Sequence, residues 1–599
     1  MNKKILLSVF IACATAAGAS AQQATSAQPA GKELNKEITL EKDFVPVEKK
    51  VTKKATLPKV KKITPPAKTN LDYSDTPVNI TMPNTIPTMM PYGYRTAHNF
   101  SDKRGYLEVG GGMQANFDGS AGYRFLDSDN SQAGIWVQHN STWAGKNNST
   151  LIPDDKMRAK QMFNDNRAGL YYNQYLKAGT LKLDAGVHFD SFNYYGAHKM
   201  DDIINYYDAD KKQALLEFGV NGAWDGKLKI NDNDLYYRAN VGFNHAGYNM
   251  VPDFYTPDAK GAKENLVQFG IGGDYEFEFG TITLDLKGDY VNFKAAQNYD
   301  AGPLPVDHNE FVFTIAPRYK WENEVFRAQA GFDLVLGDIF NNVVGATGNE
   351  GKFHIAPVVK LDVDVVDGAA IFVDLKGGNT INSLSHMASL DRYSTPLGMY
   401  TNTWRPIDGE AGFKFGPFAG FSAKLFAGYG MAKGQLVRVS EFTTFQSYLY
   451  AANTYQGYKM RGVKFGGEIN YKYRSLVDVA ASLTYAPGND DLTSEWLSGY
   501  SLGLDGARLV ADAKVKVTPI RQLAVELGMN YRGQRRFIEN DKYVDLSNAF
   551  NLHAGATWRF DKTLAVWVKA NNLLNRKYDV MPGQGTQLLN VMGGVSLVF

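Results

Sequence analysis

The sequence predicts an all-β protein: a large antiparallel transmembrane β-barrel of about 22 strands with an irregular N-terminal tail. Three observations lead to this prediction. Apolar and polar side chains alternate along many segments, short and long connections follow one another in a regular rhythm, and the 599 residues include 58 Gly, 34 Tyr and 34 Phe. A transmembrane barrel produces these features because only alternate side chains face lipid and aromatic girdles mark both interfaces. A large soluble all-β protein is the alternative that composition alone leaves open.

The first 21 residues have the features of a secretory signal peptide. Lys3 and Lys4 are followed by an apolar stretch from Ile5 to Ala17 and by Ala19-Ser20-Ala21 before Gln22. A basic region, an apolar region and small residues in that order are typical of a cleaved signal. Because the one cysteine of the chain lies inside this segment, cleavage would leave no thiol for disulfides, catalysis or a zinc site.

Residues 22–104 are predicted to form a flexible or extended periplasmic tail. They contain 14 Lys/Arg and 8 Asp/Glu, a net charge of +6, whereas residues 105–599 contain 48 and 54, a net charge of −6. Nine of the 22 prolines lie before residue 105, and no periodic apolar face accompanies them. The tail would act as a solvated tether, dock to a periplasmic partner or the cell wall, or thread into the acidic lumen. Nucleic acid is not an expected partner, because the lysines lie in an exported segment.

From about residue 105 the side chains alternate with a period of two. In the segment 180–192, Leu183 and Val187 share one face, and Lys182, His188 and Asp190 share the other. The same alternation recurs at 280–290, 360–364 and 509–517. In a membrane barrel the apolar face meets lipid and the polar face lines the lumen. The expected lumen residues mix both charges, so no ion preference follows: Lys182, Asp184, Asp285, Lys287, Asp512 and Lys514.

The expected strands are joined alternately by short turns and by long polar connections. Short turns are predicted near residues 127–132, 178–180, 225–227, 278–281, 322–324, 365–368, 417–419, 474–476, 518–521 and 561–563. Long connections are predicted at 145–165, 194–212, 248–263, 297–307, 338–351, 379–407, 432–459, 488–506, 534–547 and 573–586. With a tight connection near 116–119, this gives 22 strands and places both termini on the periplasmic side.

The last predicted strand ends the chain on an aromatic residue. One face carries Leu589, Val591, Gly593, Val595, Leu597 and Phe599. Such a strand can close the barrel against the first one, which removes the unpaired edges that lipid cannot satisfy. The first strand is expected to contain the run Gly110-Gly111-Gly112, which would relieve crowding or allow bending.

The C-terminal region carries a family resemblance. It contains Asn572, Leu573, Asn575, Lys577 and Tyr578 in a stretch that is followed by Pro582-Gly583 and by the terminal Phe599. This pattern resembles the C-terminal region of TonB-dependent transporters and covers the chain from about residue 510 onward. The resemblance implies a 22-stranded barrel in the cell outer membrane, assembly through the C-terminal strand by the outer-membrane assembly machinery, and passage or binding of a bulky solute.

The sequence departs from that family in one respect. Its transporters carry a globular plug before the barrel, and residues 22–104 show no plug pattern. Nor do they contain a convincing TonB box, since Asp43 to Val47 is the nearest apolar patch. The expectation is therefore a plug-less, porin-like barrel, with a lumen that is either open or filled by the tail, by loops or by a partner. The same departure puts TonB coupling in doubt. A scaffold that anchors periplasmic or surface partners is the alternative function.

No enzymatic, metal or cofactor site is expected. His188 and Asp190 share a lumen face, as a base and its orienting acid would, but ordinary lumen polarity explains the pair equally well. The acidic runs at 127–129 and 231–234 do not continue as calcium loops and are expected at turns or strand ends. Aromatic residues of the long connections, such as Tyr448, Tyr450 and Tyr455, are expected in girdle or loop packing rather than ligand binding.

Overall fold

The computed structural model describes residues 103–146, 148–151, 160–193, 195, 212–231, 233–249, 260–295, 307–337, 352–394, 402–440, 454–539 and 541–599. The predicted signal peptide, 1–21, and the predicted tail without a plug, 22–104, lie outside these ranges except for residues 103 and 104. Tyr448 and Tyr450 lie outside them as well.

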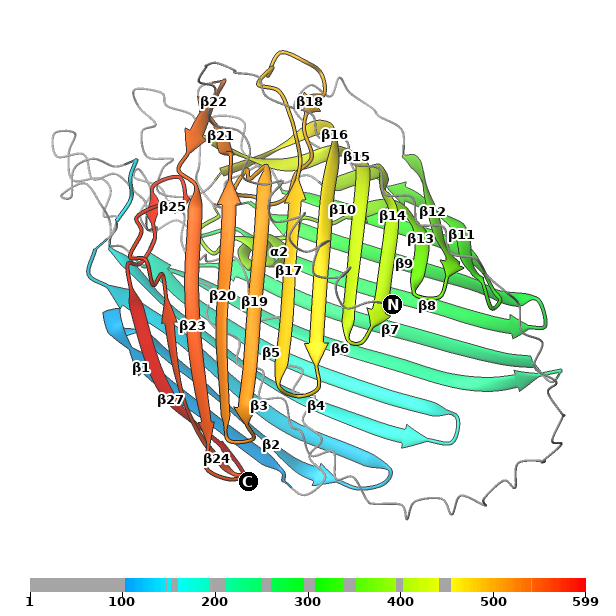
Figure 1. The fold of residues 1–599 in the computed structure, drawn as a ribbon. Helices are drawn as coiled ribbons and strands as arrows, with labels where there is room; N and C mark the ends of the chain where they lie inside the picture. The colour runs from blue at the N-terminus through cyan, green and yellow to red at the C-terminus, as the bar shows by residue number, and fades with distance from the viewer. Residues whose placement is uncertain are drawn as a thin grey trace, which may run out of the picture. The chain divides into compact units, whose positions relative to one another are not determined.

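A closed antiparallel barrel of 22 strands forms the described part of the chain, which confirms the predicted fold class and strand number (Figure 1). The first half consists of β1 Gly105–Gly112, β2 Phe117–Asp127, β3 Ser131–Ala144, β4 Gln161–Leu176, β5 Gly179–Asn193, β6 Lys212–Ile230, β7 Asn233–Tyr248, β8 Lys263–Phe277, β9 Gly280–Lys294, β10 His308–Glu322 and β11 Phe326–Gly337. The second half consists of β12 Phe353–Val366, β13 Ala369–Thr380, β14 Thr403–Phe418, β15 Phe421–Ser440, β16 Thr454–Tyr473, β17 Val477–Tyr485, β19 Leu509–Ile520, β20 Leu523–Gly533, β23 Ala549–Arg559, β24 Leu564–Asn571 and β27 Asn590–Val598.

The remaining described elements are short and lie in the connections between barrel strands. They are the 3-10 turn η1 Met113–Ala115, the helix α2 Leu384–Leu390, and the strands β18 Leu497–Ser498, β21 Arg535–Glu539, β22 Lys542–Leu546, β25 Asp579–Met581 and β26 Gln584–Gly585. No helix in the described part of the chain has both the length and the apolar character needed to cross a bilayer.

The barrel closes between its first and last strands. β1 pairs antiparallel with β27, in a register that sets Tyr106 opposite Val598 and Gly112 opposite Met592. The carbonyl oxygen of Phe599 accepts hydrogen bonds of 2.7 Å from the backbone N–H groups of Arg104 and Gly105. The first and last described residues of the barrel therefore meet at one end, as an even strand number requires.

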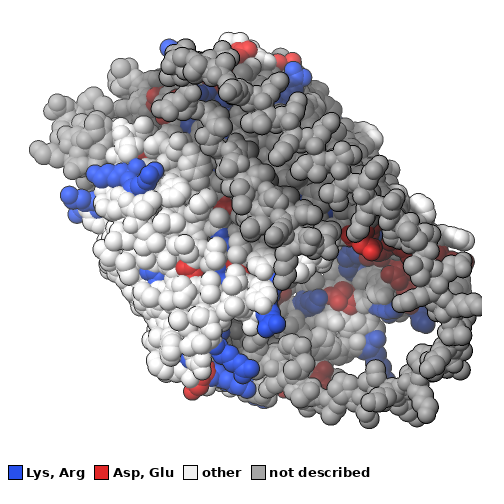
Figure 2. Space-filling model, in the orientation of Figure 1, with Lys and Arg blue, Asp and Glu red and all other residues white. Residues whose placement is uncertain are grey.

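The outer surface of the barrel is apolar. In β5, Leu183, Val187 and Phe189 are 41–44% exposed, whereas Asp190 on the opposite face is 4% exposed. Figure 2 shows few charged side chains over the outer face of the strands in view, with most of them toward the strand ends. An apolar outside and a polar inside mark a membrane barrel, because a soluble protein of this size would direct its apolar side chains inward.

The connections follow the predicted rhythm with one exception. The turn predicted at 225–227 is wrong, because β6 continues to Ile230 and the chain reverses at Asn231, which adopts a positive φ of 50°. Pairing with β7 extends along this segment and sets Gly226 opposite Tyr237. Gly226 suits this strand because a Cβ there would lie 2.3 Å from the Tyr237 hydroxyl oxygen. The acidic run at 231–234 thus begins in the turn that the Asp-Gly pair was expected to form.

The glycine run of β1 leaves room for an indole ring at the seam of the barrel. Trp567 on β24 points inward and is 4% exposed. A Cβ on Gly110 would lie 2.2 Å from its ring, and a Cβ on Gly594 would lie 2.3 Å from it. These two glycines therefore permit the close packing that the sequence suggested for the run at 110–112.

Candidate functional site in the barrel lumen

The connection between β13 and β14 folds into the lumen, and we call its described residues 381–394 the inner loop. It contains α2, whose N-terminus is capped by the Ser383 hydroxyl, which accepts a 3.1 Å hydrogen bond from the His386 N–H. The Glu264 carboxylate of β8 accepts from the Leu384 N–H at 3.1 Å. A carboxylate at this position complements the positive end of the helix and fixes it to the barrel wall.

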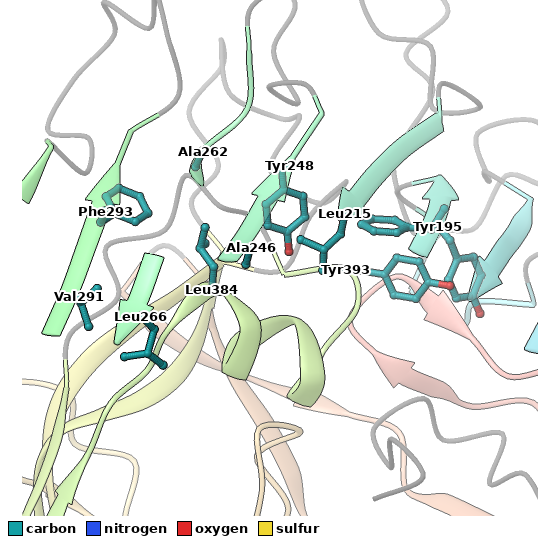
Figure 3. Close-up of a cluster of buried hydrophobic side chains, with 11 residues drawn as sticks. Tyr195, Leu215, Ala246, Tyr248, Ala262, Leu266, Val291, Phe293, Leu384 and Tyr393 are labelled. Carbon is teal, nitrogen blue, oxygen red and sulfur yellow. The ribbon is translucent and has the colours of Figure 1, made fainter. Parts of the chain in front are cut away.

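One side of the inner loop packs against the inner face of β5 to β9. Leu384 and Tyr393 belong to a cluster of buried side chains that includes Leu215, Tyr248 and Phe293 (Figure 3). The Tyr393 ring lies 5.6 Å from Phe192, with the two rings edge to face. Apolar side chains inside a lumen lose contact with water only when something covers them, and here the inner loop does so.

The other side of the inner loop packs against β15 and β16. Met387 is fully buried beside Leu436 and Tyr455. The Tyr455 hydroxyl donates a 2.7 Å hydrogen bond to the Asp391 carboxylate. The inner loop therefore spans the lumen from the wall formed by β5 to β9 to the wall formed by β15 and β16, and Tyr455 serves in loop packing, as predicted.

A buried charged cluster anchors the end of the inner loop. Arg392 donates to the carboxylates of Asp190, at 2.5 Å, and Asp165, at 2.6 Å. His188 Nε2 lies 3.1 Å from the same Asp165 carboxylate, and His188 Nδ1 forms a hydrogen bond with Glu217. All three carboxylate residues are at most 8% exposed.

The predicted pair of His188 and Asp190 is thus part of a larger constellation. Sequence reasoning missed Asp165, Glu217 and Arg392, which come from β4, β6 and the inner loop. The period-two pattern of β4 and β6 could have placed the two carboxylates on the lumen face. Arg392 carries no such signal, because it lies in a connection whose path depends on tertiary packing.

A cavity of about 860 Å³ lies in the lumen beside the inner loop. Ser383 and His386 of the inner loop line it, together with residues of β8 to β11, residues of β13 to β16, and Tyr500. Its charged lining residues are Lys287, Asp289, Asp333, Lys376, Arg405 and Asp408. Because three are basic and three acidic, the cavity favours neither cations nor anions.

Two titratable side chains from connections shape the polarity of this cavity. Burial and the neighbouring Arg405 guanidinium hold the pKa of His386 below its usual range, so its imidazole is neutral at pH 7. Burial, with a further contribution from Asp408, raises the pKa of Tyr500. Its hydroxyl donates to the Asp408 carboxylate at 3.0 Å. Both groups therefore offer neutral hydrogen-bonding atoms to the cavity.

Several predicted lumen charges are neutralised by ion pairs between strands. Lys182 contacts Asp225 at 2.6 Å, Asp285 contacts Arg238 at 2.6 Å, and Lys514 contacts Glu526 at 2.8 Å. These pairs cross between strands on the polar face, as the alternation predicts.

The C-terminal motif residues lie in the connection between β24 and β27, residues 572–589. Asn572 is fully buried, adopts a positive φ of 48°, and donates from its side-chain amide to the carbonyls of Arg576, at 2.8 Å, and Gln587, at 3.0 Å. Asn575, also at positive φ, accepts from the Leu589 N–H at 3.0 Å. The two asparagines thus shape the backbone of this connection.

The rest of the motif divides between buried and exposed positions. Tyr578 is buried with Ala549 and Val580. Pro582 is buried beside Gly583, which has a positive φ of 79° and lies between β25 and β26. Leu573 is half-buried and Lys577 is exposed. Phe599 stands at the opposite end of the barrel and is 58% exposed.

Comparison with known proteins identifies the barrel fold. No family model and no curated protein sequence matches the chain. Among solved structures, it is similar to the siderophore receptor PirA from Acinetobacter baumannii, with a TM-score of 0.63, 10% identity and coverage of 83% of this chain and 80% of that one. It is also similar to the FrpB iron transporter from Neisseria meningitidis, with a TM-score of 0.59, 12% identity and coverage of 83% and 82%.

A ferric enterobactin receptor from Pseudomonas aeruginosa has a TM-score of 0.62 at 11% identity, over 83% of this chain and 80% of that one. These neighbours are TonB-dependent receptors, and the resemblance predicted from the C-terminal motif is confirmed at the level of the fold. The chain has the closed barrel architecture of these neighbours. The neighbours are receptors and transporters rather than enzymes.

Proposed function

We propose that the barrel binds a bulky polar solute in its lumen and passes it across the outer membrane, together with a partner protein. The cavity of about 860 Å³ beside the inner loop carries this proposal. Its volume lies within the range of roughly 300–1,000 Å³ that is usual for ligand sites. Its mixture of charges, together with the neutral His386 and Tyr500, suits a solute with many hydrogen-bonding groups and little net charge.

Substitution of a lumen residue by tryptophan tests this function. Thr314 of β10 lines the cavity, whereas the next residue, Ile315, belongs to the opposite face of the same strand. We expect proteoliposomes containing the full chain to swell in neutral oligosaccharides, and we expect Thr314→Trp to slow swelling several-fold while Ile315→Trp leaves it unchanged. Equal rates for the two variants would contradict passage through this cavity, and no swelling above protein-free liposomes would contradict passage by the chain without its partner.

The inner loop favours a second function. Because it spans the lumen between two walls, it is also compatible with a barrel that serves as a scaffold for periplasmic or surface partners. Silence in planar bilayers, combined with recovery of a stoichiometric partner from outer membranes, would support the scaffold instead of passage.

The proposed organisation of the chain supplies the route to partners. Residues 1–21 would be removed as a signal peptide, residues 22–104 would form the Lys/Pro-rich periplasmic tail, and residues 105–599 would form the barrel. The tail would recruit a periplasmic partner or the cell wall through its net charge of +6 and would not couple to TonB. A pull-down with and without residues 22–104 tests this part, and an unchanged set of partners would refute it.

A further inference from the structure

We propose that Asp165, His188 and Asp190 form a binding site for a divalent transition-metal ion in the lumen, and that the ion displaces Arg392 from this site. This inference goes beyond the proposed function and does not depend on it. If it holds, metal binding removes one of the contacts that hold the inner loop at the barrel wall, the pair of ion pairs made by Arg392.

The three residues already have the spacing of metal ligands. One donor atom from each lies within 4.8 Å of the other two. His188 Nε2 and Asp165 Oδ1 are 3.1 Å apart. Two ligands bound tetrahedrally to one zinc ion at about 2.1 Å each lie about 3.4 Å apart, so this pair would have to separate by only a few tenths of an ångström. Asp165 and Asp190 come from β4 and β5, which pair directly, and the two residues stand opposite each other in the register.

The surroundings of the site orient the imidazole for coordination. His188 Nδ1 is held by Glu217, which also accepts a hydrogen bond from the Ser385 hydroxyl. A carboxylate on the far nitrogen of a histidine fixes the tautomer and the ring orientation that a metal requires. The nitrogen directed at Asp165 is therefore the one available to an ion.

One buried oxygen of the cluster lacks a partner. Asp190 is 4% exposed, and its Oδ1 atom has no hydrogen-bond donor among the described residues, whereas its Oδ2 atom binds Arg392. A buried carboxylate oxygen without a donor is unfavourable. A metal ion bound between Asp165 and Asp190 would supply the missing positive partner.

The ion would take the place of one of the two cations that the cluster already holds. Arg167 Nε lies 3.0 Å from Asp165 Oδ1, and Arg392 Nη2 lies 2.6 Å from Asp165 Oδ2. A divalent ion bound between Asp165 and Asp190 would replace the Arg392 guanidinium, whereas Arg167, which belongs to the same strand as Asp165, would keep its contact. The buried carboxylates would therefore keep positive partners, which matters because an uncompensated buried charge is costly.

The ligand set selects the kind of metal. One imidazole and two carboxylates suit zinc and its first-row neighbours, whereas magnesium and calcium prefer ligand sets of oxygen alone. Zinc is therefore the probe of choice and magnesium the control ion. Arg392 also lies 4.0 Å from the centre of the Phe163 ring, so the displaced state loses a cation–π contact as well as two ion pairs.

The test is calorimetric titration of the full chain, purified in detergent, stripped with a chelator and titrated with zinc at pH 7. We expect one ion per chain. His188→Ala and Asp190→Asn should each weaken binding by about 10- to 100-fold. Arg392→Ala should tighten it by about tenfold, because the competing cation is gone.

Two controls separate this site from general affinity for metal. His245 on β7 is another strand histidine, 2.8 Å from Asn265, and His245→Ala should bind zinc as the unaltered chain does. Heat-modifiable migration in gels establishes that each variant is a folded barrel. The proposal fails if neither the unaltered chain nor Arg392→Ala binds zinc stoichiometrically, if His245→Ala loses as much affinity as His188→Ala, or if magnesium competes equally.

Discussion

Single glycines at the closing seam determine whether the indole of Trp567 fits. A Cβ on Gly110 would lie 2.2 Å from this ring, whereas a Cβ on the neighbouring Gly111 would make only ordinary contacts, with Asn116 O at 3.7 Å and Phe117 Cδ2 at 3.9 Å. We therefore expect Gly110→Ala to destabilise the barrel by about 1–3 kcal/mol through overpacking and Gly111→Ala to change its stability far less. Urea titration of the two variants, followed by tryptophan fluorescence, measures the difference. Equal midpoints would show that the ring moves aside freely.

At the level of residues, the sequence predicted which side chains face the lumen better than it predicted which side chains they contact. The period-two pattern placed His188 and Asp190 on the lumen face, and both lie there. It could not supply Arg392, which follows them by about 200 positions and contacts Asp190 only because the inner loop folds back into the barrel. Contacts between distant connections depend on packing that no local pattern encodes.

The helix of the inner loop is the element on which the state of the lumen depends. Met387 is fully buried between Leu436 and Tyr455, whereas Ser389 on the same helix is only half-buried. An unpaired charge buried at position 387 costs several kcal/mol. Met387→Glu should therefore release the helix from β15 and β16 while the barrel stays intact. We expect a larger single-channel conductance in planar bilayers for Met387→Glu than for Ser389→Glu. Indistinguishable conductances would mean that the helix does not restrict the lumen.

The sequence predicted those secondary-structure elements whose residue pattern follows from a single physical requirement. Alternation identified the barrel strands because each residue meets either lipid or the lumen. The turn expected at Asp225-Gly226 failed because Tyr237 packs over Gly226 and keeps it in the strand. The helix α2 was not predicted, since a seven-residue segment is too short to show a helical period and is stabilised by its contacts with two walls.

At the scale of the whole molecule, the terminal aromatic residue is proposed to guide assembly. The Phe599 backbone oxygen binds both Arg104 and Gly105, while its ring is 58% exposed and stacks 6.4 Å from Tyr123. Phe599→Ala keeps the backbone bonds and removes the ring. We expect it to reduce the fraction of folded barrel in outer membranes several-fold and Leu597→Ala, on the same face, to have little effect. Gel migration without heating measures both, and equal yields would refute a role for the ring in assembly.

The closed ring of strands also constrains how the chain reaches its folded state. The pairing of β1 with β27 brings together residues from the two ends of the barrel sequence, such as Tyr106 and Val598. The first strand synthesised therefore has no permanent partner on one side until the last residues have emerged. Contacts so distant along the chain form slowly and leave strand edges exposed meanwhile. Closure of the complete barrel therefore waits for its last strand, and the edges of β1 and β27 need shielding until they pair.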